Sequence, residues 1–242
     1  LGTYYQGDIM LVPPANGRVS IPDTLTSYIW PNGTVPFEIV GNFSNSELNT
    51  IYSAMNMFKR YTCVRFVQRT ENDELFVSIV NNNTGCYSYI GRQSDNQYNL
   101  INLQTPECLM AEGTPVHEMM HALGFYHEFV RPDRDDYISI NRSALRPDLQ
   151  ADNIYDNNFG KLRSEDGQTY NISYNYGSVM HYSRYAGAQS REYPVLINKV
   201  NLKVADFGNE NGFAATDVME INFRYKCSNS YRVPRPVSPW FG

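Results

Sequence analysis

Residues 117–128 read His117-Glu-Met-Met-His-Ala-Leu-Gly-Phe-Tyr-His-Glu128, and this segment is the most informative of the chain. It contains three of the four histidines of the chain. His117 and His121 are four residues apart, so a helix presents both on one face. Gly124 lets the chain leave this helix through a left-handed turn, because a residue without Cβ adopts positive φ at little cost. The turn brings His127 back towards the other two imidazoles.

This spacing is typical of a catalytic zinc site. Three neutral imidazoles leave a fourth coordination position open for water, whereas a structural zinc has four protein ligands. Glu118 stands beside the first ligand, where it can act as a general base without itself binding the metal. The extended pattern also predicts a methionine turn downstream, and Ser178-Val179-Met180-His181-Tyr182 supplies one.

Two further segments join these motifs, Thr62-Cys63-Val64-Arg65-Phe66 and Gly85-Cys86-Tyr87-Ser88-Tyr89-Ile90-Gly91-Arg92. Together the four segments resemble the astacin family of zinc endopeptidases, and the similarity runs from about Ile29 to Cys227. The resemblance implies Zn²⁺ as the cofactor and proteins or peptides as substrates. It implies metal ligation by His117, His121 and His127 and general-base catalysis by Glu118. It also implies that Tyr182 is a mobile further ligand that stabilises the oxyanion, above an apolar floor made by Met180.

The fold class also follows mostly from the resemblance. We expect an α+β, zincin-like metallopeptidase with a twisted mixed β-sheet and two long helices in the N-terminal half. The C-terminal half should be irregular, and the active-site cleft should run between the two halves. Residues 132–176 agree with this, because asparagine, aspartate, glycine and proline dominate there.

Local patterns place the elements. Ser44 and Glu47 form a capping box before apolar residues at helical spacing, which predicts a helix over 45–61. Alternating or apolar runs predict strands over 64–67, 75–80 and 100–103. Thr114 and Pro115 suit the cap and the first position of the active-site helix, and Thr216 suits the cap of a last helix that ends near residue 225.

The cysteines indicate disulfides. Cys63, Cys86, Cys108 and Cys227 are even in number and lack the Cys-x-x-Cys spacing of thiolate zinc sites. The sequence alone permits three pairings, and the resemblance selects Cys63–Cys227 and Cys86–Cys108. Such bonds persist in oxidising compartments. Five glycosylation sequons, at Asn32, Asn42, Asn82, Asn141 and Asn171, agree with a secreted, extracellular protein.

Length and charge limit the other functional classes. The 242 residues suit one catalytic domain with a sizeable core, since 42% of them are hydrophobic. The formal net charge of −5 gives no electrostatic reason to expect nucleic acid as a partner. No apolar run approaches the roughly 18–20 residues that span a bilayer.

The N-terminus holds a second motif, Tyr4-Tyr5-Gln6-Gly7-Asp8-Ile9. It resembles the aromatic-x-Gly-Asp segment of astacin pro-peptides, which implies that Asp8 binds the metal in place of water and keeps the chain latent. A Gly-Asp pair is otherwise an ordinary turn. We expect an inhibitory pro-segment over 1–18, a catalytic domain over 19–227, and a tail or linker over 228–242 that leads to possible further C-terminal domains.

We expect an activating cut between about Asn16 and Ile21. The favoured bond is Arg18–Val19, because Arg18 is the only basic residue before Lys59 and suits a trypsin-like protease. The resemblance implies that the new amino terminus then pairs with Glu128. Two other classes stay open. A zinc-dependent recognition module has no need of Glu118, and a structural zinc domain would use Asp8 as its fourth ligand. Trimming near residue 18 separates these classes.

Overall fold

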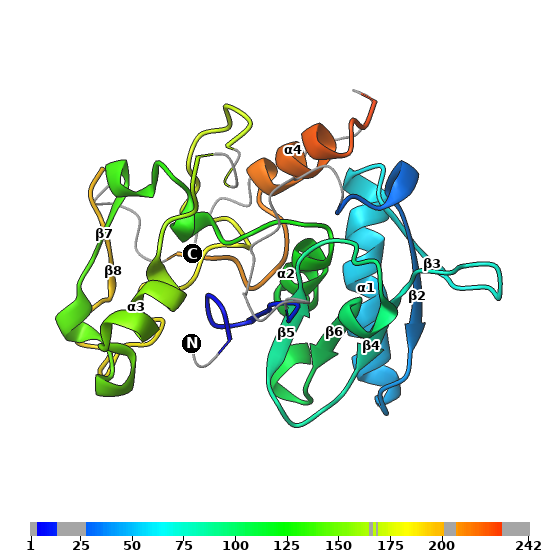
Figure 1. The fold of residues 1–242 in the computed structure, drawn as a ribbon, viewed down its shortest axis with the longest axis horizontal. Helices are drawn as coiled ribbons and strands as arrows, with labels where there is room; N and C mark the ends of the chain where they lie inside the picture. Colours follow the sequence, from blue (N-terminus) through cyan, green and yellow to red (C-terminus); the bar gives the residue numbers. More distant parts are fainter. Residues whose placement is uncertain (1–3, 14–27, 165–166, 168, 201–206, 229–242) are drawn as a thin grey trace, which may run out of the picture.

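The computed structural model describes residues 4–13, 28–164, 167, 169–200 and 207–228 (Figure 1). The expected cut between Arg18 and Val19 lies outside these residues, as does nearly all of the expected tail. Among the described residues, no helix is both long and apolar enough to cross a membrane.

A six-stranded mixed sheet forms the N-terminal half, in the order β1-β5-β6-β4-β2-β3. β5 runs antiparallel to β6, and the other neighbouring strands are parallel. The mixed sheet that we predicted is thereby confirmed. Its strands are β1 (Ile9–Met10), β2 (Thr34–Ile39), β3 (Arg65–Gln68), β4 (Val77–Val80), β5 (Cys86–Tyr89) and β6 (Leu100–Leu103).

Two helices pack against this sheet (Figure 1), α1 (Asn45–Tyr61) and α2 (Gly113–Ala122). The predicted capping box is present at the start of α1, where Ser44 and Glu47 bond each other reciprocally. Side chains from both helices and from the sheet form one buried apolar cluster. It includes Phe58 of α1, Met119 of α2 and Ile101 of β6, which are all fully buried. This cluster fixes α2, and therefore its histidines, against the sheet.

Two predicted helix caps are wrong. α2 begins at Gly113 and not after Thr114, because the amide of Gly113 is already satisfied by the Glu210 carbonyl at 2.9 Å. A Cβ at Gly113 would lie 2.5 Å from that oxygen, so the close approach requires glycine. The last helix, α4 (Ala215–Arg224), is capped at Ala214, whose amide donates to Asp217 Oδ2 at 2.7 Å.

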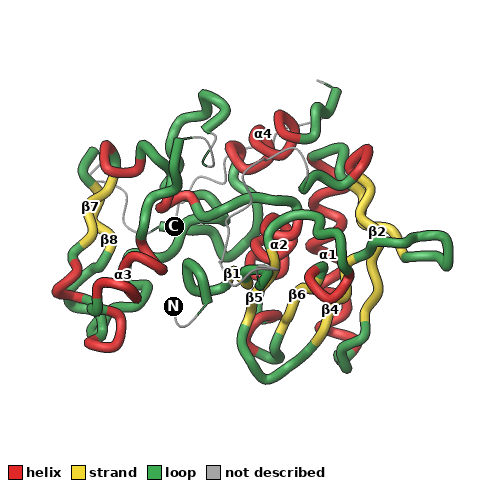
Figure 2. Tube along the Cα trace, viewed as in Figure 1, coloured by secondary structure: helices red, strands yellow, loops and turns green. Residues whose placement is uncertain are grey.

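The C-terminal half has more regular structure than we expected. β7 (Ile138–Ile140) and β8 (Leu196–Asn198) form an antiparallel pair, and α3 (Asp152–Phe159) precedes a long irregular stretch. Figure 2 shows how much of this half is loop. A second buried apolar cluster, which includes Phe129 and Phe159, holds the loops of this half together.

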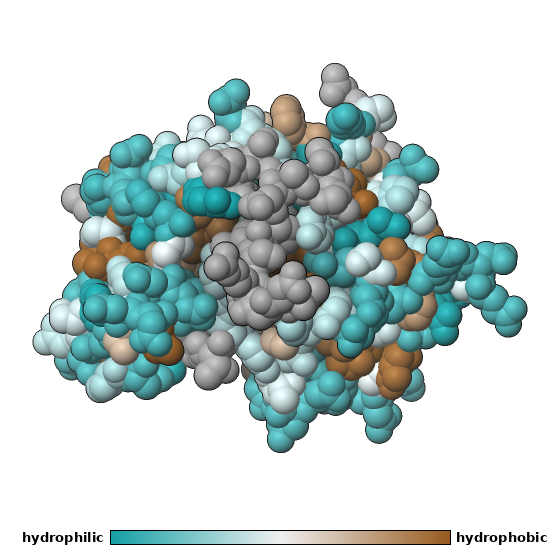
Figure 3. Space-filling model, viewed as in Figure 1, coloured by the Kyte–Doolittle hydropathy of each residue, from teal (hydrophilic) through white to brown (hydrophobic). Residues whose placement is uncertain are grey.

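Both predicted disulfides are present. Cys63–Cys227 ties the end of α1 to the residues after α4, and Cys86–Cys108 joins β5 to the segment before α2. The face shown in Figure 3 is mainly hydrophilic, with hydrophobic side chains in small separate groups. The loop between β3 and β4, which projects at the right of Figure 1, is hydrophilic as well.

Candidate metal centre and catalytic site

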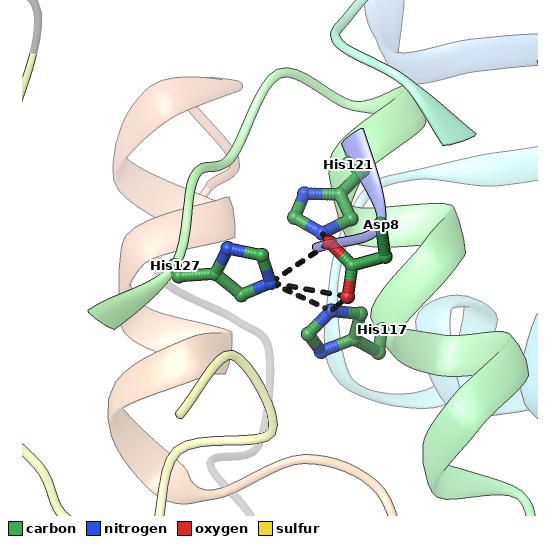
Figure 4. A group of neighbouring side chains, drawn as sticks. All are labelled: Asp8, His117, His121 and His127. Atoms are coloured by element: carbon green, nitrogen blue, oxygen red, sulfur yellow. Dashed lines mark hydrogen bonds and ion pairs between the residues drawn. The ribbon is translucent and has the colours of Figure 1, made fainter. Parts of the chain in front are cut away.

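The metal-binding motif folds as its spacing predicts. His117 and His121 lie on α2, and Gly124 follows this helix with a φ of 95°. Its amide donates to the His121 carbonyl at 2.8 Å, which closes the turn. His127 then faces the other two rings from the opposite side (Figure 4). All three histidine residues are at most 8% exposed.

Asp8 completes a group of four possible metal ligands. One ligand atom from each of the four side chains lies within 4.8 Å of all the others. Oδ1 of Asp8 is 3.1 Å from Nε2 of His127 and 3.4 Å from Nε2 of His121, and Oδ2 is 3.3 Å from Nε2 of His117. Nε2 of His117 and Nε2 of His127 are 3.1 Å apart.

These distances fit zinc. Bonds of roughly 2.0–2.1 Å in a tetrahedron place neighbouring ligand atoms roughly 3.3 Å apart. Two atoms of the group, Asp8 Oδ1 and His121 Nε2, are buried and find no hydrogen-bond partner among the described residues. Buried polar atoms are normally paired, so their common focus indicates a cation between them.

A hydrogen-bond acceptor at Nδ1 orients each imidazole. Nδ1 of His117 lies 2.7 Å from the Val179 carbonyl, and Nδ1 of His121 lies 2.7 Å from the Phe125 carbonyl. Nδ1 of His127 lies 3.0 Å from Oε1 of Gln6. With the proton on Nδ1, every Nε2 presents its lone pair to the metal position.

The methionine turn is held by a residue that the sequence analysis missed. Asp217 of α4 accepts from the Ser178 hydroxyl at 2.5 Å and from the Val179 amide at 3.0 Å. Burial raises the pKa of Asp217 to about 6 against the effect of these donors. Met180, 2% exposed, lies in the turn as predicted. The only signal for Asp217 was its place near a helix start, which does not identify a partner 39 positions away.

Glu118 has the environment of an acid–base group. It is 1% exposed, and its Oε2 has no hydrogen-bond partner in the part of the chain that the structure describes. Burial, and then the negative charge of Asp8, raise the pKa of Glu118 well above its ordinary value. A carboxyl whose pKa moves towards neutrality is suited to take up and return a proton at the pH at which most enzymes work.

Tyr182 reaches the same site from the methionine turn. Its hydroxyl lies 2.8 Å from Oδ2 of Asp8 and 2.7 Å from the Gln6 carbonyl. Burial and the nearby Asp8 charge raise the pKa of Tyr182 well above its ordinary value, so the phenol keeps its proton and is a hydrogen-bond donor. Tyr182 is thus within hydrogen-bond reach of a group at the fourth metal position.

Asp8 is ionised despite its position. Burial opposes its ionisation. When no metal is bound and the facing Nε2 atoms carry protons, the charge of His127 and hydrogen bonds from the three imidazoles hold the pKa of Asp8 well below the ordinary value. A metal cation would act in the same direction. Asp8 therefore presents a charged carboxylate, and not a neutral carboxyl group, to a metal at this position.

Tyr4, Gly7 and Asp8 of the N-terminal segment line a cavity of about 700 Å³, whose walls also include His117, Glu118 and Tyr182. β1 is the edge strand of the sheet and pairs in parallel with β5, with Ile9 opposite Ser88. The Tyr4 hydroxyl donates to the Thr84 carbonyl at 3.2 Å. The segment is thus fixed on both sides of Asp8.

Glu128 is a buried residue and not a surface charge. It is 5% exposed, and Oε1 accepts from Arg131 at 3.1 Å and from the Asn175 amide at 2.8 Å. Burial raises the pKa of Glu128 to about 7. Nη1 of Arg131 also lies 3.9 Å from Oε1 of Glu220, so two carboxylates share this nitrogen. Both carboxylates line a cavity of about 40 Å³.

Comparison with known families agrees with this geometry. The family model described as Astacin, a peptidase family, matches residues 23–226. High choriolytic enzyme 1 of Oryzias latipes is 38% identical over 229 residues, which cover 92% of this chain and 77% of that protein. Zinc metalloproteinase nas-14 of Caenorhabditis elegans is 35% identical over 210 residues, covering 86% of this chain. The chain spans only 39% of nas-14 and 27% of the similar Xenopus laevis bone morphogenetic protein 1.

Solved structures give the same result. High choriolytic enzyme 1, described as a hatching enzyme zinc-protease from medaka fish, superposes with a TM-score of 0.71 at 35% identity. The match covers 84% of this chain and 96% of that one. Myroilysin, at 21% identity and a TM-score of 0.62, shares the fold.

Proposed function

Since this chain belongs to the astacin family of peptidases, we propose that it is the catalytic unit of a secreted endopeptidase that its own N-terminal segment holds latent. Family membership makes it a zinc metalloendopeptidase unit. One observation carries the latency: the Asp8 carboxylate faces all three imidazoles of the metal motif.

In this proposal His117, His121 and His127 hold the zinc and Asp8 fills the fourth position. Zinc, when bound, supplies the Lewis acidity that polarises the scissile carbonyl and acidifies the attacking water. Asp8 excludes that water from the place where it must bind. The neighbouring contacts of Tyr4 and β1 keep Asp8 there.

Once Asp8 has left, Glu118 and Tyr182 act on the substrate. The unpaired Oε2 of Glu118 takes a proton from the attacking water and returns it to the leaving amine. The Tyr182 hydroxyl, released from Asp8 and Gln6, donates to the oxygen on which negative charge develops. Both residues therefore have a use that metal binding alone does not explain.

We propose the boundaries 1–18 for the inhibitory segment, 19–227 for the catalytic domain and 228–242 for a tail or linker. A trypsin-like protease cuts after Arg18, and the new amino terminus enters the cavity beside Glu128 and Glu220. Two disulfides support secretion, and four of the five sequon asparagines, Asn32, Asn42, Asn82 and Asn171, are exposed.

A structural zinc domain is the second candidate, because Asp8 and the three histidines make a closed set of four protein ligands. Glu118 argues against it. A structural site gains nothing from a buried carboxyl whose Oε2 is unpaired. A zinc-dependent recognition module has no need of Glu118 either.

Limited digestion with trypsin separates these functions. We expect the treated chain to begin at Val19 and to cleave a quenched fluorescent peptide library, and a zinc chelator should abolish the cleavage. The untreated chain should be inactive while carrying one zinc. A trimmed chain with zinc bound and no peptidase activity would favour the structural role.

A further inference from the structure

The outer shell of the metal site is divided between two parts of the chain. His117 and His121 bond to main-chain carbonyls at Val179 and Phe125, which belong to the catalytic domain. His127 bonds to the Gln6 side chain, 121 positions away in the N-terminal segment. Among the described residues, Gln6 is the one acceptor at Nδ1 of His127. Activation therefore removes one orienting contact as well as the Asp8 ligand.

The protonation of His127 fixes the orientation of the Gln6 amide. Nε2 of His127 lies 3.1 Å from Oδ1 of Asp8 and 3.1 Å from Nε2 of His117, so this nitrogen must offer a lone pair to the cation. The ring proton is then on Nδ1. Its partner must be the carbonyl oxygen of the amide, since the opposite orientation would set two donors against each other.

Main-chain bonds hold Gln6 in place. Gln6 is fully buried. Its main-chain N–H donates to the Asn157 carbonyl at 2.9 Å, and its main-chain carbonyl accepts from the Tyr182 hydroxyl. Asn157 of α3 also donates to the Tyr4 carbonyl at 2.9 Å. Nε2 of Gln6 has no hydrogen-bond partner among the described residues, which is unfavourable for a buried donor. The bond to His127 is therefore the one polar contact of this side chain within the described structure.

We propose that Gln6 is a positioning residue of the zinc site, and that the N-terminal segment thereby strengthens zinc binding as well as blocking catalysis. An acceptor at the distal nitrogen fixes the tautomer and the orientation of a ligating imidazole and raises its basicity. Gln6 adds this effect to the direct bond from Asp8. The uncleaved chain is then the form that loads zinc. The inference rests on the proposed assignment of the three histidines as ligands.

Zinc affinity of the full-length chain tests the proposal. All chains carry Glu118→Gln, so that none can digest itself, and their Kd for zinc is measured by competition with a chromogenic chelator. Loss of an outer-shell partner lowers metal affinity by about 10–100-fold, so Gln6→Leu should raise Kd by about that factor. Gln6→Glu keeps an acceptor oxygen and should bind at least as tightly as the parent. Gln68→Leu, at an exposed glutamine of β3, should leave Kd unchanged.

Two results would overturn the proposal. One is a Gln6→Leu chain with a Kd within twofold of the parent, and the other is an equal loss for Gln6→Leu and Gln6→Glu. If Gln6→Leu does not fold, NMR of the zinc-loaded parent decides. Slowly exchanging Nδ1–H signals are expected from the three ligand imidazoles, in addition to that of buried His181, whose Nδ1 lies 2.7 Å from the Tyr182 carbonyl. Absence of the His127 signal would contradict the role of Gln6. These results do not test whether the N-terminal segment keeps the chain latent. A parent chain that binds no zinc would contradict the proposed function itself.

Discussion

The Tyr182 hydroxyl lies 2.8 Å from Oδ2 of Asp8, although 174 positions separate the two residues. The same hydroxyl lies 2.7 Å from the Gln6 carbonyl. A phenol has one proton to donate, so the N-terminal segment offers Tyr182 two competing acceptors. In the proposed function, the segment that blocks the reaction thus also binds the residue that stabilises it. Removal of the segment frees the metal position and Tyr182 together.

Tyr182→Phe should slow the activated enzyme without abolishing its activity. Loss of one oxyanion donor costs about 10²–10³-fold in kcat in other hydrolases. KM should change little, because the donor acts on charge that develops only in the transition state. Steady-state kinetics of the trypsin-activated chain measures both constants. Tyr193→Phe, at an exposed tyrosine, is the control. Parental kcat in Tyr182→Phe would exclude this role.

Acid should destabilise the chain partly through His181. Burial lowers the pKa of His181 from 6.5 to about 4. The unfolded state therefore binds a proton between these pH values while the folded state does not, so stability is lost as pH falls from about 6.5 to about 4. The full loss is about 3 kcal/mol.

Denaturant unfolding of the chelator-treated chain at pH 7 and pH 4.5 tests this contribution. His181→Gln replaces a titrating ring that lies 2.6 Å from the Tyr174 hydroxyl. The variant should start from a lower free energy of unfolding and lose less of it on acidification. A variant with the same pH dependence as the parent would show that His181 does not titrate as described.

The two disulfides should differ in their contributions to stability. Cys63–Cys227 closes a loop of 164 residues, and Cys86–Cys108 closes one of 22. The chain-entropy relation gives about 5 kcal/mol for the first and about 3 kcal/mol for the second. Paired Cys→Ser variants, compared by denaturant unfolding, should follow this order. The reverse order would mean that native-state contacts outweigh loop entropy here.

The metal motif could be predicted closely because its geometry is local. One helix turn and one left-handed turn at Gly124 separate His117 from His127. Both turns are determined by residues that are close together in the sequence. Asp8 was predicted from a resemblance to pro-peptides, and the structure places it against the three imidazoles. Its function as a switch remains a prediction.

Residues that depend on long-range partners could not be predicted. Asp217 supports the methionine turn from 39 positions away, and Gln6 contacts His127 from 121 positions away. Nothing in the neighbourhood of either residue indicates its partner. The cap at Thr114 failed for a related reason, because the Glu210 carbonyl satisfies the start of α2 from a distant segment. Contacts between residues far apart in the sequence cannot be predicted from local propensity.

Substitution of Asp8 by alanine tests the central claim most directly. Peptidase activity of the untrimmed Asp8→Ala chain is compared with that of the untrimmed parent and of the Asp8→Ala, Glu118→Gln double variant, with zinc content measured in all three. We expect the Asp8→Ala chain to be active, or to activate itself, without added protease, while the parent and the double variant stay inactive. An Asp8→Ala chain that is as latent as the parent, with zinc still bound, would contradict it and would show that the segment blocks the cleft by its bulk alone.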